Sequence, residues 1–377
     1  KGKTYNYPKK IQSLAARLDK PPQRGKLVHR IGVASGPNRL QLAKSFLTFS
    51  DLPEWETTFS EHEELMSFHR WNWLLSALTT ERKKPSAAWG VNIMRSWLAK
   101  FSSVPGGEIG ESYSVGERVA NGILFMRATS GNWQKIPDDL LQSFEDMAFF
   151  LQRNLEYHSG ELTGNHVLNN ARAMFLLGHC AENDEFIKLA MAIFKEQMPK
   201  LFPEGAFLRE GSSHYQFLIA RWLLEMRLIA EEVSDINNKN TLDNFLIPIL
   251  GGCEFFLVRD QNQSFEFPLI GDVSPDCEPA WLKHLPFSQI ANSVRHSTVR
   301  ATQTGWNTLF LEKPDAYETE TSLCKDRQPK WEAYVESGWY KFSGFGWIAI
   351  WHFENPSGEA IATHAHYDAC SPVLFFN

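Results

Sequence analysis

Hydrophobic residues recur at intervals of three and four positions from about residue 60 to residue 257. This spacing places apolar side chains along one face of an α-helix. The pattern predicts helices over residues 63–78, 86–101, 114–126, 137–155, 165–178, 184–198, 214–233 and 242–257. Because short polar segments join them, we expect consecutive helices to pack antiparallel as αα-hairpins. A series of such hairpins builds either a solenoid or a closed α/α toroid.

Serine residues mark the expected starts of two of these helices, and Pro137 with the two aspartates after it marks a third. Ser114 and Glu117 have the spacing of a capping box, so Ser114 is expected to cap the helix that follows it. Ser212 or Ser213 can cap the helix that holds Tyr215, because serine hydroxyls accept hydrogen bonds from the free N–H groups of a first turn. All three signals support the boundaries given by the hydrophobic pattern.

The pattern changes near residue 300 to short runs that alternate or are continuously apolar. Glycine, proline, serine and asparagine separate these runs, as is typical of antiparallel strands joined by turns. The pattern predicts strands over residues 305–312, 331–337, 338–343, 346–354, 359–368 and 371–377.

We therefore predict an α+β chain of two domains. Residues 1–295 form the helical domain, and residues 296–377 begin an antiparallel β-sandwich. The last predicted strand is apolar to its end, and six strands are few for a large sandwich. We accordingly expect the sequence to stop inside this second domain.

Charge and composition exclude several classes of function. The net charge is −6 and the basic residues are scattered, so no nucleic-acid partner is expected. No apolar run approaches the ~20 residues that a membrane-spanning helix needs, and we expect no transmembrane segment. The five cysteines are widely spaced, so they predict neither a disulfide framework nor a thiolate zinc site.

A first polar group lies where the helix over residues 165–178 begins. Asn165 and His166 occupy its first turn and leave the apolar stripe to the residues that follow. A helix N-terminus offers free N–H groups and partial positive charge, so an asparagine and a histidine there could hold a carboxylate. The alternative is that Asn165 only caps the helix and His166 is solvated.

A second polar group surrounds a Gly-Ser-Ser turn that leads into an aromatic-rich helix. Arg209, Glu210, His214 and Tyr215 gather there. A tyrosine acts as a base near neutral pH only where cations favour its phenolate, and Arg209 or a histidine could do so. The alternative is that Tyr215 is a packing residue of its helix.

A third group is the stretch THAHYD, in which His364, His366 and Asp368 alternate along a predicted strand. Alternate strand residues share one face of a sheet, so the three side chains are expected on the same side. All three could ligate one metal ion, or one histidine could act on a substrate while the other anchors a metal. An exposed polar strand face remains the third reading.

The chain resembles the heparinase II/III-like polysaccharide lyases, including relatives associated with bacterial surface polysaccharides. The resemblance covers roughly residues 60–377 and rests on the order of six stretches: RWNWLLSAL, SYSVGERVAN, TGNHVLNNARAMFLLG, EGSSHYQFLIARWLLE, PLIGDVSPD and THAHYDACS. It implies an incomplete α/α toroid followed by an antiparallel β-sandwich, with the active site in the cleft between them.

The resemblance also implies roles for individual residues. Asn165 would neutralise a uronate carboxylate, with His166 lining the same subsite. Tyr215 would be the acid/base, and His364 would assist proton abstraction. His366 would be a metal ligand.

The expected reaction is β-elimination in an acidic polysaccharide or oligosaccharide substrate. Arg209 and His214 are candidate substrate-binding residues. A structural divalent metal, zinc or calcium, is expected at His366, with its remaining ligands outside this sequence. The resemblance implies a periplasmic or secreted protein, and a cytoplasmic location stays open.

Two other functions compete with the lyase. A glycoside hydrolase on an α/α toroid would use paired carboxylates, here Asp272 with Glu210 or Asp276. A non-catalytic glycan-binding or surface-polysaccharide assembly protein would use the same fold without chemistry.

Overall fold

The computed structural model describes residues 7–19, 31–32, 34–80, 84–158, 163–259, 265–274, 277, 328–353 and 372–376. Its contacts divide the chain into two compact units. Unit 1 comprises Lys1–Glu196 with Leu228–Ile236, and unit 2 comprises Gln197–Arg227 with Asn237–Asn377. The predicted domain boundary near residue 295 lies outside the described residues. In the described ranges, no helix is both long and apolar enough to cross a membrane.

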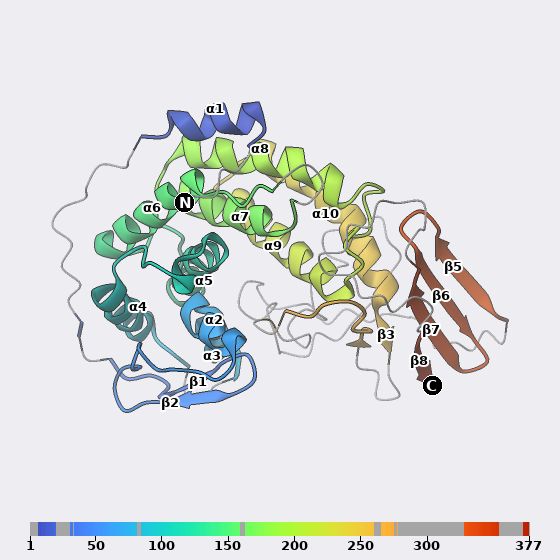
Figure 1. Ribbon diagram of the computed structural model, residues 1–377, viewed down its shortest axis with the longest axis horizontal. Coiled ribbons are helices and arrows are strands. Elements are labelled where there is room, and N and C mark those ends of the chain that lie inside the picture. Colours follow the sequence, from blue (N-terminus) through green and yellow to red (C-terminus); the bar gives the residue numbers. More distant parts are fainter. Residues whose placement is uncertain are drawn as a thin grey trace. The chain divides into compact units, whose positions relative to one another are not determined.

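Most of the described chain is helical (Figure 1). Unit 1 contains α1 (Lys9–Arg17), the hairpin of β1 (Arg39–Gln41) and β2 (Phe46–Thr48), α2 (His62–Arg70), α3 (Asn72–Thr80), α4 (Ala87–Phe101), η1 (Glu108–Gly110), α5 (Ser112–Ser130), α6 (Asp138–Arg153) and α7 (His166–Cys180). Three further helices contain residues of both units: α8 (Asp184–Leu201), α9 (Ser213–Glu232) and α10 (Ile236–Phe256).

Helix α5 is the central element of unit 1. It contacts α2, α3, α4, α6 and α7, and every residue from Ser112 to Met126 is buried. A helix that is buried on all sides should be apolar throughout, yet α5 carries Glu117, Arg118 and Asn121 in its middle. These polar residues must therefore be paired inside the unit.

Helices α5 and α7 are joined by polar side chains along their length. Asn169 Nδ2 donates to the Tyr113 carbonyl at 3.0 Å, and Arg172 Nη1 donates to Glu117 Oε1 at 2.9 Å. The residue numbers of the contacts increase together along both helices, from Tyr113 and Asn169 to Glu117 and Arg172. The two helices therefore run parallel, and their N-termini lie at the same end. Gly116 permits this approach, since a Cβ there would lie 3.1 Å from the Asn169 side chain.

Two expectations about helix boundaries were wrong. The helix predicted over residues 114–126, with Ser114 as its cap, is α5, which starts at Ser112 with Glu111 at the N-cap. Ser114 therefore lies within the first turn and donates to Glu111 Oε1 at 2.9 Å. Glu117 cannot complete a capping box because it is buried against Arg172. The helix predicted over residues 63–78 is broken at Trp71, whose φ of 66° is left-handed.

Unit 2 contains an antiparallel sheet with the order β5-β6-β7-β8 (Figure 1). Its strands are β5 (Lys330–Tyr334), β6 (Trp339–Gly344), β7 (Trp347–His352) and β8 (Val373–Phe376), and a short pair is formed by β3 (Val258–Arg259) and β4 (Phe265–Glu266). Trp339 is buried and its ring lies 4.6 Å from that of Phe256, so one sheet face packs on the end of α10.

The prediction of a helical part followed by antiparallel strands is therefore confirmed. The strands predicted over residues 331–337, 338–343, 346–354 and 371–377 are present with slightly different ends. Those predicted over residues 305–312 and 359–368 lie outside the described residues.

Replacing Arg172 with methionine should lower the thermal unfolding midpoint by roughly 10 °C. The change leaves the Glu117 carboxylate buried without its cationic partner, and breaking one side of such a pair destabilises by about 3–5 kcal/mol. Calorimetry measures the midpoint, with Arg153→Met, a change at an exposed position of α6, as the control. Equal midpoints for the two variants would contradict the importance of the pair.

Candidate functional site

The Asn165 side chain is buried and unpaired. Asn165 is the N-cap residue of α7, but its side chain makes no capping hydrogen bond and it is 0% exposed. Within the described part of the chain, neither its Oδ1 nor its Nδ2 has a hydrogen-bond partner. Burying an amide without partners is unfavourable, so simple capping does not account for this asparagine.

His166 lies beside Asn165 and pairs with a carboxylate. Its Nδ1 lies 3.1 Å from Glu156 Oε1, and nearly half of its side chain remains exposed. Partial burial lowers the pKa of His166, but the hydrogen bond and charge of Glu156 outweigh it, and the pKa is raised above its usual value of 6.5. The expectation that His166 could be merely solvated is not what the structure shows.

Glu156 is itself fixed by α7. Asn170 Nδ2 donates to Glu156 Oε2 at 3.3 Å, and the Glu156 N–H donates to Asn170 Oδ1 at 3.2 Å. The same Asn170 Nδ2 donates to the Ser112 carbonyl at 3.2 Å. Asn170 thus links Glu156, the partner of His166, to the N-terminus of α5 through hydrogen bonds.

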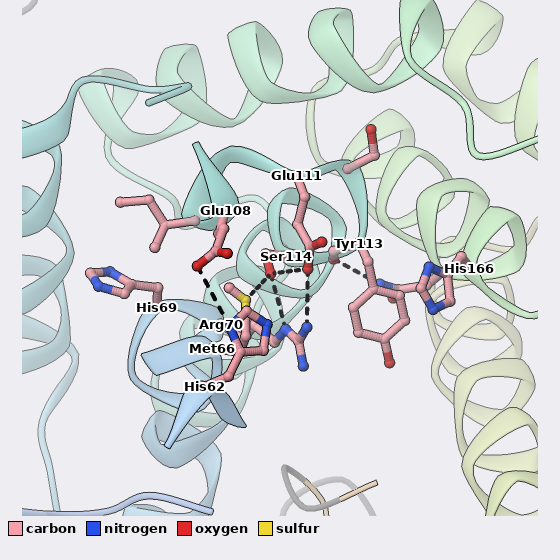
Figure 2. Close-up of polar contacts among 12 residues, drawn as sticks. His62, Met66, His69, Arg70, Glu108, Glu111, Tyr113, Ser114 and His166 are labelled. Atoms are coloured by element: carbon pink, nitrogen blue, oxygen red, sulfur yellow. Dashed lines mark hydrogen bonds and ion pairs between the residues drawn. The ribbon is translucent and has the colours of Figure 1, made fainter. Parts of the chain in front are cut away.

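Tyr113 connects this group to Arg70 (Figure 2). Its ring centroid lies 4.6 Å from that of His166, and the Arg70 guanidinium carbon lies 4.8 Å from the Tyr113 ring centroid. Arg70 Nε donates to Ser114 Oγ at 3.0 Å and Arg70 Nη2 donates to Glu111 Oε1 at 3.1 Å. The N-termini of α5 and α7 therefore carry one continuous polar cluster.

Sequence reasoning missed Arg70, Glu111 and Tyr113 as members of this cluster. They come from separate segments of the chain, and no local spacing links Arg70 to the other two. One available signal was the pair of charged residues inside the apolar stretch after Tyr113, which marks a helix with internal polar contacts.

The Gly-Ser-Ser turn in unit 2 is built by hydrogen bonds to the segment around residue 270. Gly211 has φ of +67°, a conformation that favours glycine. Ser212 Oγ accepts from the Tyr215 N–H at 3.1 Å, so Ser212 is the residue that caps α9, as one of the two predicted alternatives had it. Ser213 Oγ donates to the Pro268 carbonyl at 2.6 Å.

His214 is buried at this turn with both ring nitrogens engaged. Its Nδ1 accepts from the Ser274 N–H at 3.3 Å, so Nε2 carries the proton and donates to the Cys277 carbonyl at 2.8 Å. Burial lowers the pKa of His214 to about 4, and the nearby Arg221 guanidinium adds to this effect. His214 is therefore neutral near pH 7 and holds the residue 270 segment, while its predicted contact with substrate stays a prediction.

Tyr215 is more accessible than its neighbours. It is partly exposed at the start of α9, and Arg209, also partly exposed, precedes the same turn. The structure thus brings Arg209, His214 and Tyr215 into one segment of unit 2, while Asn165 and His166 belong to unit 1. Of the carboxylates considered for a hydrolase, Glu210 is buried and Asp276 lies outside the described residues.

His364, His366 and Asp368 all lie outside the described residues. Across the ranges that the structure describes, no group of three or more histidine, cysteine, aspartate or glutamate side chains could hold a metal ion. The predicted roles of His364 and His366 therefore stay predictions.

Comparison with known proteins gives one structural likeness. No protein family matches the chain, and no curated protein does. A crystal structure of a heparan sulfate lyase HepC mutant from Pedobacter heparinus is similar, with a TM-score of 0.48 and 15% sequence identity. The match covers 99% of this chain and 55% of that chain, so this chain spans about half the length of that protein. A likeness of this size is no basis for assigning an activity.

Replacing Glu156 with glutamine should lower the pKa of His166, because the ring loses the charge that opposes its desolvation. A raised pKa stabilises the folded state below the unfolded value near 6.5. That contribution disappears as the pH rises through the folded value. NMR titration of the imidazole protons measures the pKa, with Glu185→Gln at an exposed pair as the control. An unchanged pKa in Glu156→Gln would contradict the assigned pairing.

Proposed function

We propose that this protein is a polysaccharide lyase that cleaves a uronic-acid-containing glycan by β-elimination. One observation carries the proposal: a buried, unpaired Asn165 amide lies at the N-terminus of α7 beside a histidine whose pKa is raised. This combination suits the recognition of a carboxylate, and the resemblance of the sequence motifs to heparinase II/III-like lyases supports the same role.

The chemistry explains why such donors are needed. β-Elimination removes the proton on C5 of the uronate, and negative charge then develops on the neighbouring carboxylate. Hydrogen-bond donors that are already in place stabilise this charge in the transition state. The amide of Asn165 can donate to carboxylate oxygens, and the His166 ring can do so in its protonated form, which the raised pKa favours. In this proposal they lower the barrier to loss of the C5 proton.

A base must take the C5 proton and an acid must protonate the departing O4 oxygen. We assign these roles to Tyr215 and His364, with Arg209 binding the substrate and His214 contributing to substrate binding only by holding the residue 270 segment in place. The hydroxyls of Ser212 and Ser213 bind the Tyr215 turn to the residue 270 segment, which supports Tyr215 as a positioned group. The order of the two proton transfers depends on which face of the sugar carries the proton.

The remaining expectations belong to the same proposal. The helices would form an incomplete α/α toroid, and the sheet would be part of a β-sandwich. His366 would hold a structural zinc or calcium ion, which would stabilise its strand when bound. The protein would act in the periplasm or outside the cell on an acidic polysaccharide.

Tyr215→Phe should fold normally and lose about 10²–10⁴-fold in rate, because only the proton-carrying hydroxyl is deleted. The assay is the ultraviolet absorbance of the unsaturated uronate product, measured on a panel of bacterial and animal uronate polymers. Tyr340→Phe, on strand β6, is the matched control and should keep full activity. Near-normal turnover in Tyr215→Phe would refute the acid/base assignment.

Asn165→Ala should lose activity without losing stability. The change removes a donor whose bond strengthens as charge develops, so kcat and kcat/KM should fall together, and less so for esterified uronates. Because the buried amide is unpaired, its removal should not lower the free energy of unfolding.

Asn183→Ala provides the contrast. Asn183 Oδ1 accepts from the Glu185 and Phe186 N–H groups and so caps α8. Its removal should destabilise by about 1 kcal/mol and leave the kinetics unchanged. Chemical denaturation and kinetics on both variants measure the difference. Destabilisation of Asn165→Ala to the same extent, with unchanged kinetics, would show that Asn165 is only a structural residue.

A further inference from the structure

Arg70 stands beside a strained residue. Trp71, which follows it, is fully buried and has φ 66° and ψ 14° at the end of α2. A bulky side chain in the left-handed region is a genuine outlier, and such residues cost roughly 1–3 kcal/mol. Strain of this kind persists only where the surrounding contacts determine the backbone, and it gathers at functional positions.

Three side chains hold the backbone at this point. Trp73 Nε1 donates to the Phe68 carbonyl at 3.0 Å. Arg118 Nη1 donates to the His69 carbonyl at 2.6 Å and Asn121 Nδ2 donates to the Arg70 carbonyl at 2.9 Å, both from the buried face of α5. The last carbonyls of α2 are thus bound by side chains, and the position from which Arg70 extends is fixed.

The Arg70 side chain is in turn oriented on three sides (Figure 2). Nε donates to Ser114 Oγ, Nη2 donates to Glu111 Oε1, and the guanidinium lies near the Tyr113 ring. Only 12% of the side chain is exposed. Arginine recognises planar oxyanions through such an oriented fork of N–H groups.

The Glu111 carboxylate shows which ligand this arrangement accepts. It receives hydrogen bonds from Arg70 Nη2 at 3.1 Å and Ser114 Oγ at 2.9 Å, while 41% of its own side chain stays exposed. Glu111 makes no side-chain capping bond to α5, although it is the N-cap residue. Its carboxylate can therefore leave without unfolding the helix start, and a part-exposed ion pair is weak.

We propose that Arg70 and Ser114 form an oxyanion subsite, which the Glu111 carboxylate occupies until a carboxylate or sulfate group of the ligand displaces it. The subsite adjoins Tyr113, whose other neighbour is His166. That the oxyanion belongs to a second acidic group of the glycan rests on the proposed function. The substrate class is then a polymer with acidic groups on neighbouring sugars.

The test is an NMR titration of arginine Nε–H signals in the full chain with sodium sulfate and, separately, sodium acetate, at constant ionic strength. The Arg70 signal is assigned by its loss in Arg70→Gln, or in Arg70→Lys should the glutamine variant not fold. In the wild type, the chemical shift of the Arg70 Nε–H signal should change with anion concentration and reach saturation. Binding should tighten about two- to fivefold in Glu111→Gln, the change expected when a weak competing carboxylate is removed. Arg153, exposed on α6, supplies the control signal.

Saturable binding of either anion would support the subsite, and tighter binding of acetate than of the more highly charged sulfate would favour a uronate as the second group. A shift of the Arg70 signal that is no larger than that of Arg153, in the wild type and in Glu111→Gln, would overturn the subsite. Absence of an unsaturated product on every polymer, with saturable sulfate binding retained, would refute the lyase and leave the subsite standing.

Discussion

The buried ion pair between Arg172 and Glu117 is the interaction on which unit 1 depends. Both side chains lie almost completely out of solvent, and Asn169 and Asn121 each make a further hydrogen bond to the pair. Such a pair contributes little net stability relative to apolar residues, but it leaves a large penalty if the helices shift past one another. It therefore fixes the parallel register of α5 and α7 more strictly than apolar packing would.

The candidate site follows from that register. Two parallel helices bring their N-termini to one end, and each terminus contributes free N–H groups and partial positive charge. Glu111 and Glu156 balance this charge, and Arg70 and His166 pair with them. Asn165 alone among these residues is buried without a hydrogen-bond partner. That contrast is why we place the carboxylate of the substrate at Asn165.

Much of the helical part could be predicted from the sequence because its apolar stripes are regular. The start of α9 at the Gly-Ser-Ser turn was predicted for the correct reason, since Ser212 caps it. The break at Trp71 could not be predicted, because neither glycine nor proline marks it. The left-handed backbone there is held by side chains about 50 residues away. Ser114 misled in a similar way, since its hydroxyl binds Glu111 and Arg70 rather than the helix backbone.

The candidate site was predictable only where one segment carries it. Asn165 and His166 are adjacent, and their place at the N-terminus of α7 follows from the apolar stripe after them. The partners Glu156 and Tyr113 are supplied by packing between segments, which local spacing does not encode. The pairing with Glu156, which raises the pKa of His166, was therefore invisible before the structure.

The central claim is that the protein breaks a glycosidic bond by elimination, with charge developing on a uronate carboxylate at Asn165. The most direct measurement is the mass of the products formed in water enriched in heavy oxygen. Elimination incorporates no oxygen from the solvent at the cleaved bond, and the account predicts unlabelled products with an unsaturated sugar at the new non-reducing end. Products that carry one heavy oxygen per cleavage and lack the unsaturated sugar would mean hydrolysis and would contradict it.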